Sequence, residues 1–223
     1  MQILNICGGL NGDVFLVVTE NKTAVFDTGT PFESKKLIEN LKSVLGDRKL
    51  DYIFISHTHY DHLGGVAYLK EIYSEAKVFG SVYAKNILEK ETALKAIRNM
   101  ASFENFIPEY KDEVLKVDIT LVDGEEFEEE DFKVIAFETM GHTKCSMSFL
   151  VNDEVLFVSE SIGYMDRLGG VHSAYLVGYE LAMASIEKIK QIKCKYVVAP
   201  HYGLRSDVSE YFNQCEKDRK SVV

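Results

Sequence analysis

The sequence has 223 residues and contains few basic side chains. Lysine and arginine total 25, against 35 aspartates and glutamates, which gives a formal net charge of −10 at pH 7. A chain this acidic lacks the basic footprint of nucleic-acid-binding proteins and is a poor match to anionic membrane surfaces. We therefore expect a small-molecule substrate, and neither a nucleic acid nor a membrane as partner.

Cysteine is also scarce, and the four that occur (at 7, 145, 194 and 215) form no CxxC pair. Isolated thiols of this kind are typical of reduced cytosolic proteins and argue against a zinc–thiolate site. Residues 1–5 lack the basic segment of a secretion signal. No apolar run approaches the roughly 20 residues needed to span a bilayer. These features predict a cytoplasmic protein.

Only three prolines occur, and no tract rich in serine, glycine or proline interrupts the chain. We therefore expect neither linkers nor disordered regions. Apolar residues make up 46% of the sequence, which is enough for a substantial core. This length fits one α/β domain with a modest insertion. We predict a single domain over residues 1–223.

Strands followed by helices occur twice along the sequence. Two such blocks predict an α/β fold in which two sheets pack together with helices outside. The expected strands are residues 3–6, 14–19, 23–26, 51–56 and 77–79 in the first block, and 116–122, 132–138, 146–151, 155–158 and 196–199 in the second. The expected helices are residues 31–45, 66–73 and 179–192, and the residues after 203.

Residues 81 to about 113 interrupt the first block. Their apolar positions recur at helical spacing and predict one or two helices, which lead into an aromatic stretch at 103–110. Two interpretations stay open. The segment is either an insertion that packs on the sheet or a lid over a substrate pocket.

Six histidines occur in the chain, and three of them lie within residues 57–62. Side chains two positions apart in extended backbone point the same way, so His57 and His59 can hold one ion together. Asp61 and His62 lie where the chain turns into a helix and can face a second ion. Imidazole and carboxylate are usual ligands of zinc and similar metals. Without a metal, a buried cluster of this kind would leave charged or unpaired groups, so we predict a metal site.

Residues 57–62 read HTHYDH and match the HxHxDH signature of the metallo-β-lactamase superfamily, which the chain resembles over nearly its whole length. Asp27-Thr28-Gly29 resembles the early aspartate-glycine loop of that family. Gly141-His142-Thr143 resembles its third histidine motif, and His201 its last histidine. The resemblance implies a four-layer αββα sandwich of two mixed β-sheets flanked by helices, with the site at one edge of the sheets.

The resemblance also implies a ligand set for two ions. His57, His59 and His142 would bind one ion, and Asp61, His62 and His201 the other. The superfamily places an aspartate between the ions, but residues 156–161 read LFVSES, so the bridging position falls on Glu160. Its longer arm leaves open the ion spacing, the metal identity and whether one or two ions bind. We expect two divalent ions, zinc by default, with iron or manganese as alternatives.

The expected activity is hydrolysis of an ester-type bond (a thioester, lactone or phosphoester) by a metal-bound hydroxide. The resemblance implies that Asp61 carries the proton to the leaving group. Tyr164 and His172 are candidates for hydrogen bonds to the substrate. Tyr175 and Tyr202 are weaker candidates, since most tyrosines serve packing.

Two other functions stay open. One is a mononuclear iron oxidoreductase that resembles persulfide dioxygenases, with His57, His142 and Glu160 as ligands. A di-iron oxidoreductase fits less well, because such relatives have glutamate where this chain has His59. The other is a binding or signalling protein that retains the fold without turnover. The sequence does not predict an oligomeric state.

Overall fold

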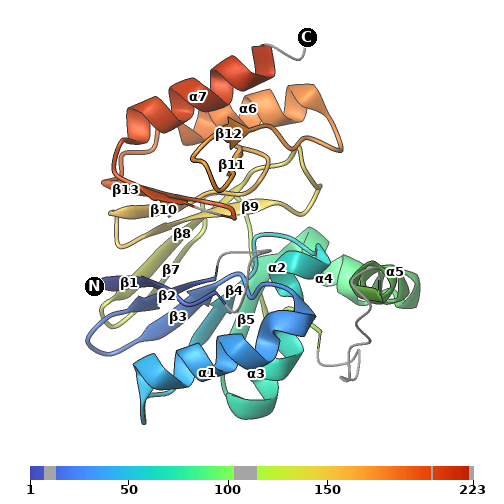
Figure 1. Ribbon diagram of the computed structural model, residues 1–223, viewed down its shortest axis with the longest axis vertical. Helices are drawn as coiled ribbons and strands as arrows, with labels where there is room; N and C mark the ends of the chain where they lie inside the picture. Colours follow the sequence, from blue (N-terminus) through green and yellow to red (C-terminus); the bar gives the residue numbers. More distant parts are fainter. Residues whose placement is uncertain (8–13, 103–114, 202, 221–223) are drawn as a thin grey trace. The chain divides into compact units, whose positions relative to one another are not determined.

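A computed structural model of the protein describes residues 1–7, 14–102, 115–201 and 203–220 (Figure 1). The chain divides into two compact units, Met1–Leu121 and Val122–Val223. Each unit contains a six-stranded sheet with helices beside it, which confirms the α/β class. The prediction of a single domain stays a prediction.

The sheet of the first unit is mixed, with strand order β1-β2-β3-β4-β5-β6. Its first three strands pair antiparallel, and β3 to β6 pair parallel. The strands are β1 (Gln2–Asn5), β2 (Phe15–Val18), β3 (Thr23–Phe26), β4 (Tyr52–Phe54), β5 (Lys77–Ser81) and β6 (Ile119–Leu121). The helices are η1 (Pro31–Glu33), α1 (Ser34–Leu45), α2 (Tyr60–Leu63), α3 (Val66–Ile72), α4 (Val82–Leu88) and α5 (Glu91–Ser102).

A ladder of aromatic rings fills the centre of this first sheet. Phe26 on β3 stacks on Phe54 of β4 with ring centroids 4.9 Å apart, and Phe54 stacks on Phe79 of β5 at 4.6 Å. Helices α1 and α3 lie side by side on one face of the sheet (Figure 1). The apolar stripe of α1 is buried there because Leu37 and Leu41 recur at helical spacing. The ladder holds the ends of β3 and β4, which lead into the site loops.

The sheet of the second unit has the order β14-β13-β10-β9-β8-β7, and a separate two-stranded hairpin pairs β11 with β12. β10 pairs parallel with β13, and the other neighbours are antiparallel. The strands are β7 (Glu126–Glu129), β8 (Phe132–Glu138), β9 (Met147–Val151), β10 (Val155–Phe157), β11 (Tyr164–Met165), β12 (Val171–His172), β13 (Tyr196–Ala199) and β14 (Gly203–Arg205). The helices are α6 (Tyr179–Ile189) and α7 (Val208–Lys220).

Helices α6 and α7 cover one face of this second sheet (Figure 1). Ile186 of α6 and Tyr211 of α7 are fully buried in one cluster with Leu156 and Val197 from the strands. The turn between β9 and β10 is Asn152-Asp153, with φ of 49° and 54°. Two successive residues with positive φ match the right-handed twist of a hairpin.

The structure also contains strands that the sequence did not predict, namely β7, β11, β12 and β14. β7 reads EFEE and is largely exposed, so it lacks the apolar pattern of a buried strand. Two helices, α4 and α5, occupy the described part of the insertion predicted at 81–113. Its aromatic stretch at 103–110 lies outside the described residues, so the lid and the packing insertion both stay predictions. No helix among the described residues has the length and apolar character needed to cross a membrane.

Candidate metal centre

In the first unit, the histidine-rich loop begins where the buried strand β4 ends. His57 is fully buried, and its Nδ1 lies 2.9 Å from the hydroxyl of Ser56. Its Nε2 lies 3.0 Å from Nδ1 of His59. His59 has extended backbone, with φ of −72° and ψ of 149°, and helix α2 begins at the next residue. The predicted alternation therefore holds, and two imidazole nitrogens face each other as a chelating pair would.

Helix α2 brings the other two ligand candidates of this unit to the same loop. The ring of His62 lies 4.1 Å from the ring of His57, measured between centroids. A carboxylate oxygen of Asp61 lies 3.7 Å from Nε2 of His62. Nδ1 of His62 lies 2.8 Å from the carboxylate of Asp27, which can only accept a hydrogen bond when ionised. Nε2 is therefore the nitrogen of His62 that can bind a metal.

The Asp27-Thr28-Gly29 loop after β3 holds this histidine loop in place. Asp27 has φ of 55° and accepts hydrogen bonds from the backbone N–H and the hydroxyl of Ser56, at 2.7 and 2.8 Å. The N–H and hydroxyl of Thr28 donate to the carbonyl of His62, at 2.7 and 2.9 Å. Contacts of this kind orient the side chains that could bind a metal.

In the second unit, the carboxylate of Glu160 lies between two histidines. Its Oε2 is 2.7 Å from Nε2 of His142, and its Oε1 is 2.7 Å from Nε2 of His201. Glu160 follows β10 and His201 follows β13, and these strands are parallel neighbours whose carboxyl ends meet at one sheet edge. Glu160 is buried rather than a surface carboxylate. The two oxygens thus reach two different ligands, as a bridging group must.

The backbone around His142 fixes the ring from several sides. Nδ1 lies 2.5 Å from the carbonyl of Ala174, and the backbone N–H donates to the hydroxyl of Ser161 at 2.8 Å. The preceding Gly141 has φ of 146°, and a Cβ there would lie 2.6 Å from Cβ of Ala182 on α6. Only glycine fits this close approach.

These contacts show that the residues fit a metal ion. A carbonyl only accepts hydrogen bonds, so Nδ1 of His142 carries the proton. Nε2 is then the nitrogen of His142 that faces the Glu160 oxygen, and these two atoms belong to a group of side chains that could hold a metal ion. Seven described side chains, all imidazoles or carboxylates, can each offer one ligand atom to an ion: His57, His59, Asp61, His62, His142, Glu160 and His201.

The β11–β12 hairpin brings both predicted substrate residues close to a ligand candidate. The ring of Tyr164 lies 5.4 Å from the ring of His172 and meets the ring of His201 edge-on at 5.6 Å. Nε2 of His172 lies 2.7 Å from the carboxylate of Asp166. Asp166 was not among the site residues predicted from the sequence. The turn residues Gly169-Gly170, which separate it from His172, were the available signal.

The two weaker substrate candidates gain nothing from the structure. The ring of Tyr175 lies 5.5 Å from the ring of Tyr179, measured between centroids, in an edge-on arrangement typical of packing. Tyr202 lies outside the described residues.

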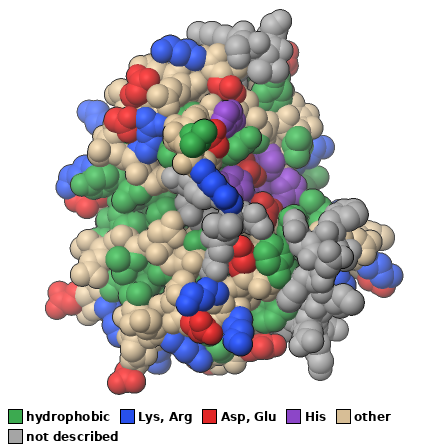
Figure 2. Space-filling model, viewed as in Figure 1, with side chains coloured by type: hydrophobic (Ala, Val, Ile, Leu, Met, Phe, Trp, Pro, Cys, Tyr) green, Lys and Arg blue, Asp and Glu red, His purple; other side chains and the backbone are tan. Residues whose placement is uncertain are grey.

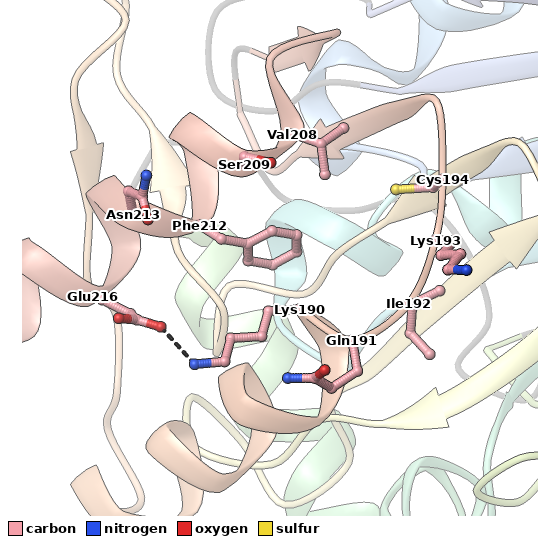
Figure 3. Close-up of a pocket in the computed structure, with 10 residues that line it drawn as sticks. All are labelled: Lys190, Gln191, Ile192, Lys193, Cys194, Val208, Ser209, Phe212, Asn213 and Glu216. Atoms are coloured by element: carbon pink, nitrogen blue, oxygen red, sulfur yellow. Dashed lines mark hydrogen bonds and ion pairs between the residues drawn. The ribbon is translucent and has the colours of Figure 1, made fainter.

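A cavity of about 600 Å³ in the second unit lies between the end of α6 and helix α7 (Figure 3). Its lining includes Phe212 and Cys194, and Lys190 forms an ion pair with Glu216 at 2.8 Å on its rim. Burial raises the pKa of the Cys194 thiol to about 11. None of the seven ligand candidates lines this cavity. Figure 2 shows acidic and basic side chains interspersed on one face, with histidine side chains exposed among them.

Comparison with known proteins gives the family. The model of the Metallo-beta-lactamase superfamily matches residues 7–201. The chain is 31% identical over 165 residues to the metallo-beta-lactamase fold-containing protein ST1585 of Sulfurisphaera tokodaii, over 71% of this chain and 62% of that protein. In the crystal structure of ST1585, described as an archaeal metallo-beta-lactamase superfamily protein from Sulfolobus tokodaii, the fold agrees with a TM-score of 0.74 at 27% identity, over 95% of this chain and 85% of that chain.

Two relatives of different activity match shorter regions. The flavo-diiron protein FprA2 of Clostridium acetobutylicum is 33% identical over 87 residues, which is 37% of this chain and 22% of that protein. A hydroxyacylglutathione hydrolase of Dictyostelium discoideum is 37% identical over 67 residues, which is 30% of this chain and 24% of that protein. The chain therefore spans less than two thirds of the length of these curated relatives.

Proposed function

Because the chain belongs to the metallo-beta-lactamase superfamily, we propose that it is a metal-dependent hydrolase acting on an ester-type bond of a small molecule. In this proposal the chain binds two divalent ions, zinc by default. His57, His59, His142 and Glu160 would hold one ion, and Asp61, His62 and His201 would hold the other. The family resemblance implies that Glu160 would be shared between the two ions.

The observation that supports a hydrolase most directly is the pair of nitrogens that His57 and His59 present to one another at 3.0 Å. The family resemblance places a glutamate at the position of His59 in di-iron oxidoreductases, so a chelating imidazole there favours the hydrolases. The hydroxyacylglutathione hydrolase among the relatives is consistent with a thioester as one substrate class. Lactones and phosphoesters have the same requirement for an activated water.

The side chains around the site have separate tasks in this mechanism. When bound, the ions supply Lewis-acid activation of water and of the substrate oxygen. Asp61 lies in the first turn of α2 with its carboxylate partly exposed, where it can take a proton from water and give it to the leaving group. Asp27 and the carbonyl of Ala174 contact Nδ1 of His62 and of His142, so that Nε2 of each ring would be the atom that binds a metal. Tyr164 and His172 contact the substrate.

Metal analysis and a substrate screen test the proposal together. Protein purified without chelators is analysed for bound metal and assayed on thioesters, lactones and phosphoesters with added zinc, manganese or iron. We expect His59→Ala and His142→Ala each to abolish hydrolysis and to lower the metal content. Lys144→Ala, an exposed neighbour of His142, is the matched control and should retain both. Wild-type turnover in either histidine variant would remove the central claim.

The same experiment separates the other function classes. One iron per chain, with oxygen uptake on a persulfide, would replace the hydrolase by an oxidoreductase. The match to a flavo-diiron protein is the reason to include iron oxidoreductases among the alternatives. Absence of turnover with every metal and substrate would favour a binding protein.

A further inference from the structure

We propose that Asp166 is a positioning residue that fixes His172 with Nδ1 directed to the substrate, so that the β11–β12 hairpin recognises a substrate hydroxyl or amide N–H. This inference rests on the proposed hydrolase function and names the substrate feature that the same site would select. It is carried by contacts within the second unit alone, around the hairpin labelled in Figure 1.

The tip of the hairpin is built to hold the Asp166 carboxylate in one orientation. Its Oδ1 accepts hydrogen bonds from the backbone N–H groups of Leu168 and Gly170, at 2.8 and 2.9 Å. The backbone N–H of Asp166 donates to the carbonyl of Gly170 at 2.9 Å. Gly169 has φ of 84°, and a Cβ on Gly170 would lie 2.9 Å from Oδ2 of Asp166. The tip therefore leaves one carboxylate oxygen, Oδ2, for a side-chain partner.

That partner is His172, whose Nε2 lies 2.7 Å from Oδ2. The hydrogen bonds from His172 and from the two backbone N–H groups hold the pKa of Asp166 below its usual range. An ionised carboxylate only accepts, so Nε2 of His172 must carry a proton. In the neutral ring the lone pair then lies on Nδ1, and no described residue forms a hydrogen bond to that atom.

The location of this ring points to recognition of the substrate. Tyr164 lies against the His172 ring on one side and against the His201 ring on the other, with centroid distances of 5.4 and 5.6 Å. The side chain of His172 is 43% exposed, so a ligand can reach it. The ring of Tyr164 contacts both His172 and the ligand candidate His201. The Nδ1 lone pair of His172 can therefore accept a hydrogen bond from a hydroxyl or amide group beside the bond being hydrolysed.

Asp166→Asn is a sharp test of the positioning role. The amide oxygen of the asparagine takes the place of Oδ1 and keeps the two backbone hydrogen bonds, so its NH₂ group faces Nε2 of His172. An NH₂ group donates, and we therefore expect the proton to move from Nε2 to Nδ1. ¹⁵N NMR of histidine-labelled, zinc-loaded protein at a pH where the ring is neutral distinguishes the two tautomers, with His172→Gln assigning the signal. An unchanged tautomer in Asp166→Asn would overturn the positioning role.

The kinetic arm tests recognition with paired substrates, one carrying a hydroxyl or amide donor next to the ester-type bond and one lacking it. We expect Asp166→Asn and His172→Gln to raise the KM for the first substrate about tenfold more than the KM for the second. Leu168→Ala is the matched control, because it removes a 96% exposed side chain and keeps the tip N–H groups. Equal effects on both substrates would overturn the recognition role. If the wild type hydrolyses nothing, the hydrolase proposal fails, while the tautomer result still decides the role of Asp166.

Discussion

The family resemblance places Glu160 where the superfamily has an aspartate, and the effect of its longer arm can be measured. Its oxygens lie 2.7 Å from both His142 and His201. Aspartate is shorter by about 1.5 Å, so one carboxylate cannot reach both rings without a shift.

We expect Glu160→Asp to keep bound metal but to change the preference among zinc, iron and manganese, measured by competition and elemental analysis. Glu160→Gln should lower metal affinity by roughly 10- to 100-fold. An unchanged metal profile in Glu160→Asp would show that the longer arm is incidental.

A second residue-scale prediction concerns Cys194, whose pKa burial raises to about 11. Burial penalises the thiolate, so the thiol stays protonated at neutral pH and reacts slowly, since the thiolate is the nucleophile. Below this pKa, alkylation by iodoacetamide should speed up about tenfold per pH unit. Because an unfolded thiol ionises at lower pH, raising the pH from about 9 to 11 should also lower stability. Mass spectrometry of the Cys194 peptide, compared with denatured protein, measures the rate. If Cys194 in the folded protein were alkylated at pH 8 as fast as in the denatured protein, the prediction of a slowly reacting thiol would be wrong.

The ligand candidates could be named from the sequence, but most of the residues that support them could not. The geometry of the HTHYDH motif follows from its sequence. Alternation in extended backbone, followed by the start of a helix, orients His57, His59 and His62. Asp166 was missed because its role depends on a hairpin tip of five residues that folds back on His172. The carbonyl of Ala174 could not be found from any side-chain pattern, because every residue has a carbonyl.

At the scale of elements, helix α7 holds the loop that positions His142. The backbone N–H and the hydroxyl of Ser173 both donate to the carboxylate of Asp218, at 2.7 and 2.5 Å. The next residue, Ala174, provides the carbonyl for His142. We expect Asp218→Ala to lower the free energy of unfolding by about 1–3 kcal/mol and to weaken metal binding. Urea unfolding and metal titration measure the two effects.

Lys217→Ala is the control for this element, because Lys217 is the exposed neighbour of Asp218 on α7. It should change neither quantity. A loss of stability without any loss of metal affinity in Asp218→Ala would show that α7 supports the sheet but not the site.

Among the elements, long apolar strands and helices at regular spacing were predictable, and short ones were not. β11 and β12 have two residues each, too few for any alternation to be seen. Strand β14 has only three residues. It is defined by its pairing with β13, which no pattern in the sequence indicates. The Asn152-Asp153 turn was predictable because those residue types tolerate positive φ.

At the scale of the whole molecule, the seven ligand candidates divide between the two compact units, four in the first and three in the second. If the ligand candidates of both units are needed to bind the ions, removing those of either unit should abolish the stabilisation by metal. We expect added zinc to raise the melting temperature of the wild type, by an amount equivalent to about 2.7 kcal/mol at 100 times Kd. His59→Ala and His142→Ala should each lose most of this gain.

The double variant His59→Ala/His142→Ala decides between shared and separate sites. For a shared centre, its loss of zinc stabilisation should be no larger than that of a single variant, because coupled residues are not additive. Differential scanning calorimetry with and without zinc measures all four proteins. Additive losses would indicate an independent ion in each unit.

Composition predicted the fold class because the apolar fraction and the alternation of strand and helix blocks require layers that bury a core. The substrate was beyond prediction at this scale. The residues proposed to contact it, Tyr164 and His172, lie on strands of two residues, which are too short to show a pattern in the sequence.

The contact between Gly141 and Ala182 has a consequence for protein engineering. A Cβ at position 141 would lie 2.6 Å from that of Ala182, so α6 presses directly on the backbone that carries His142. In a saturation library, both positions should tolerate almost no change. A larger side chain at one position cannot compensate for a change at the other. Variation intended to reshape substrate selection is therefore best directed at exposed loop positions such as Leu176, which is 73% exposed.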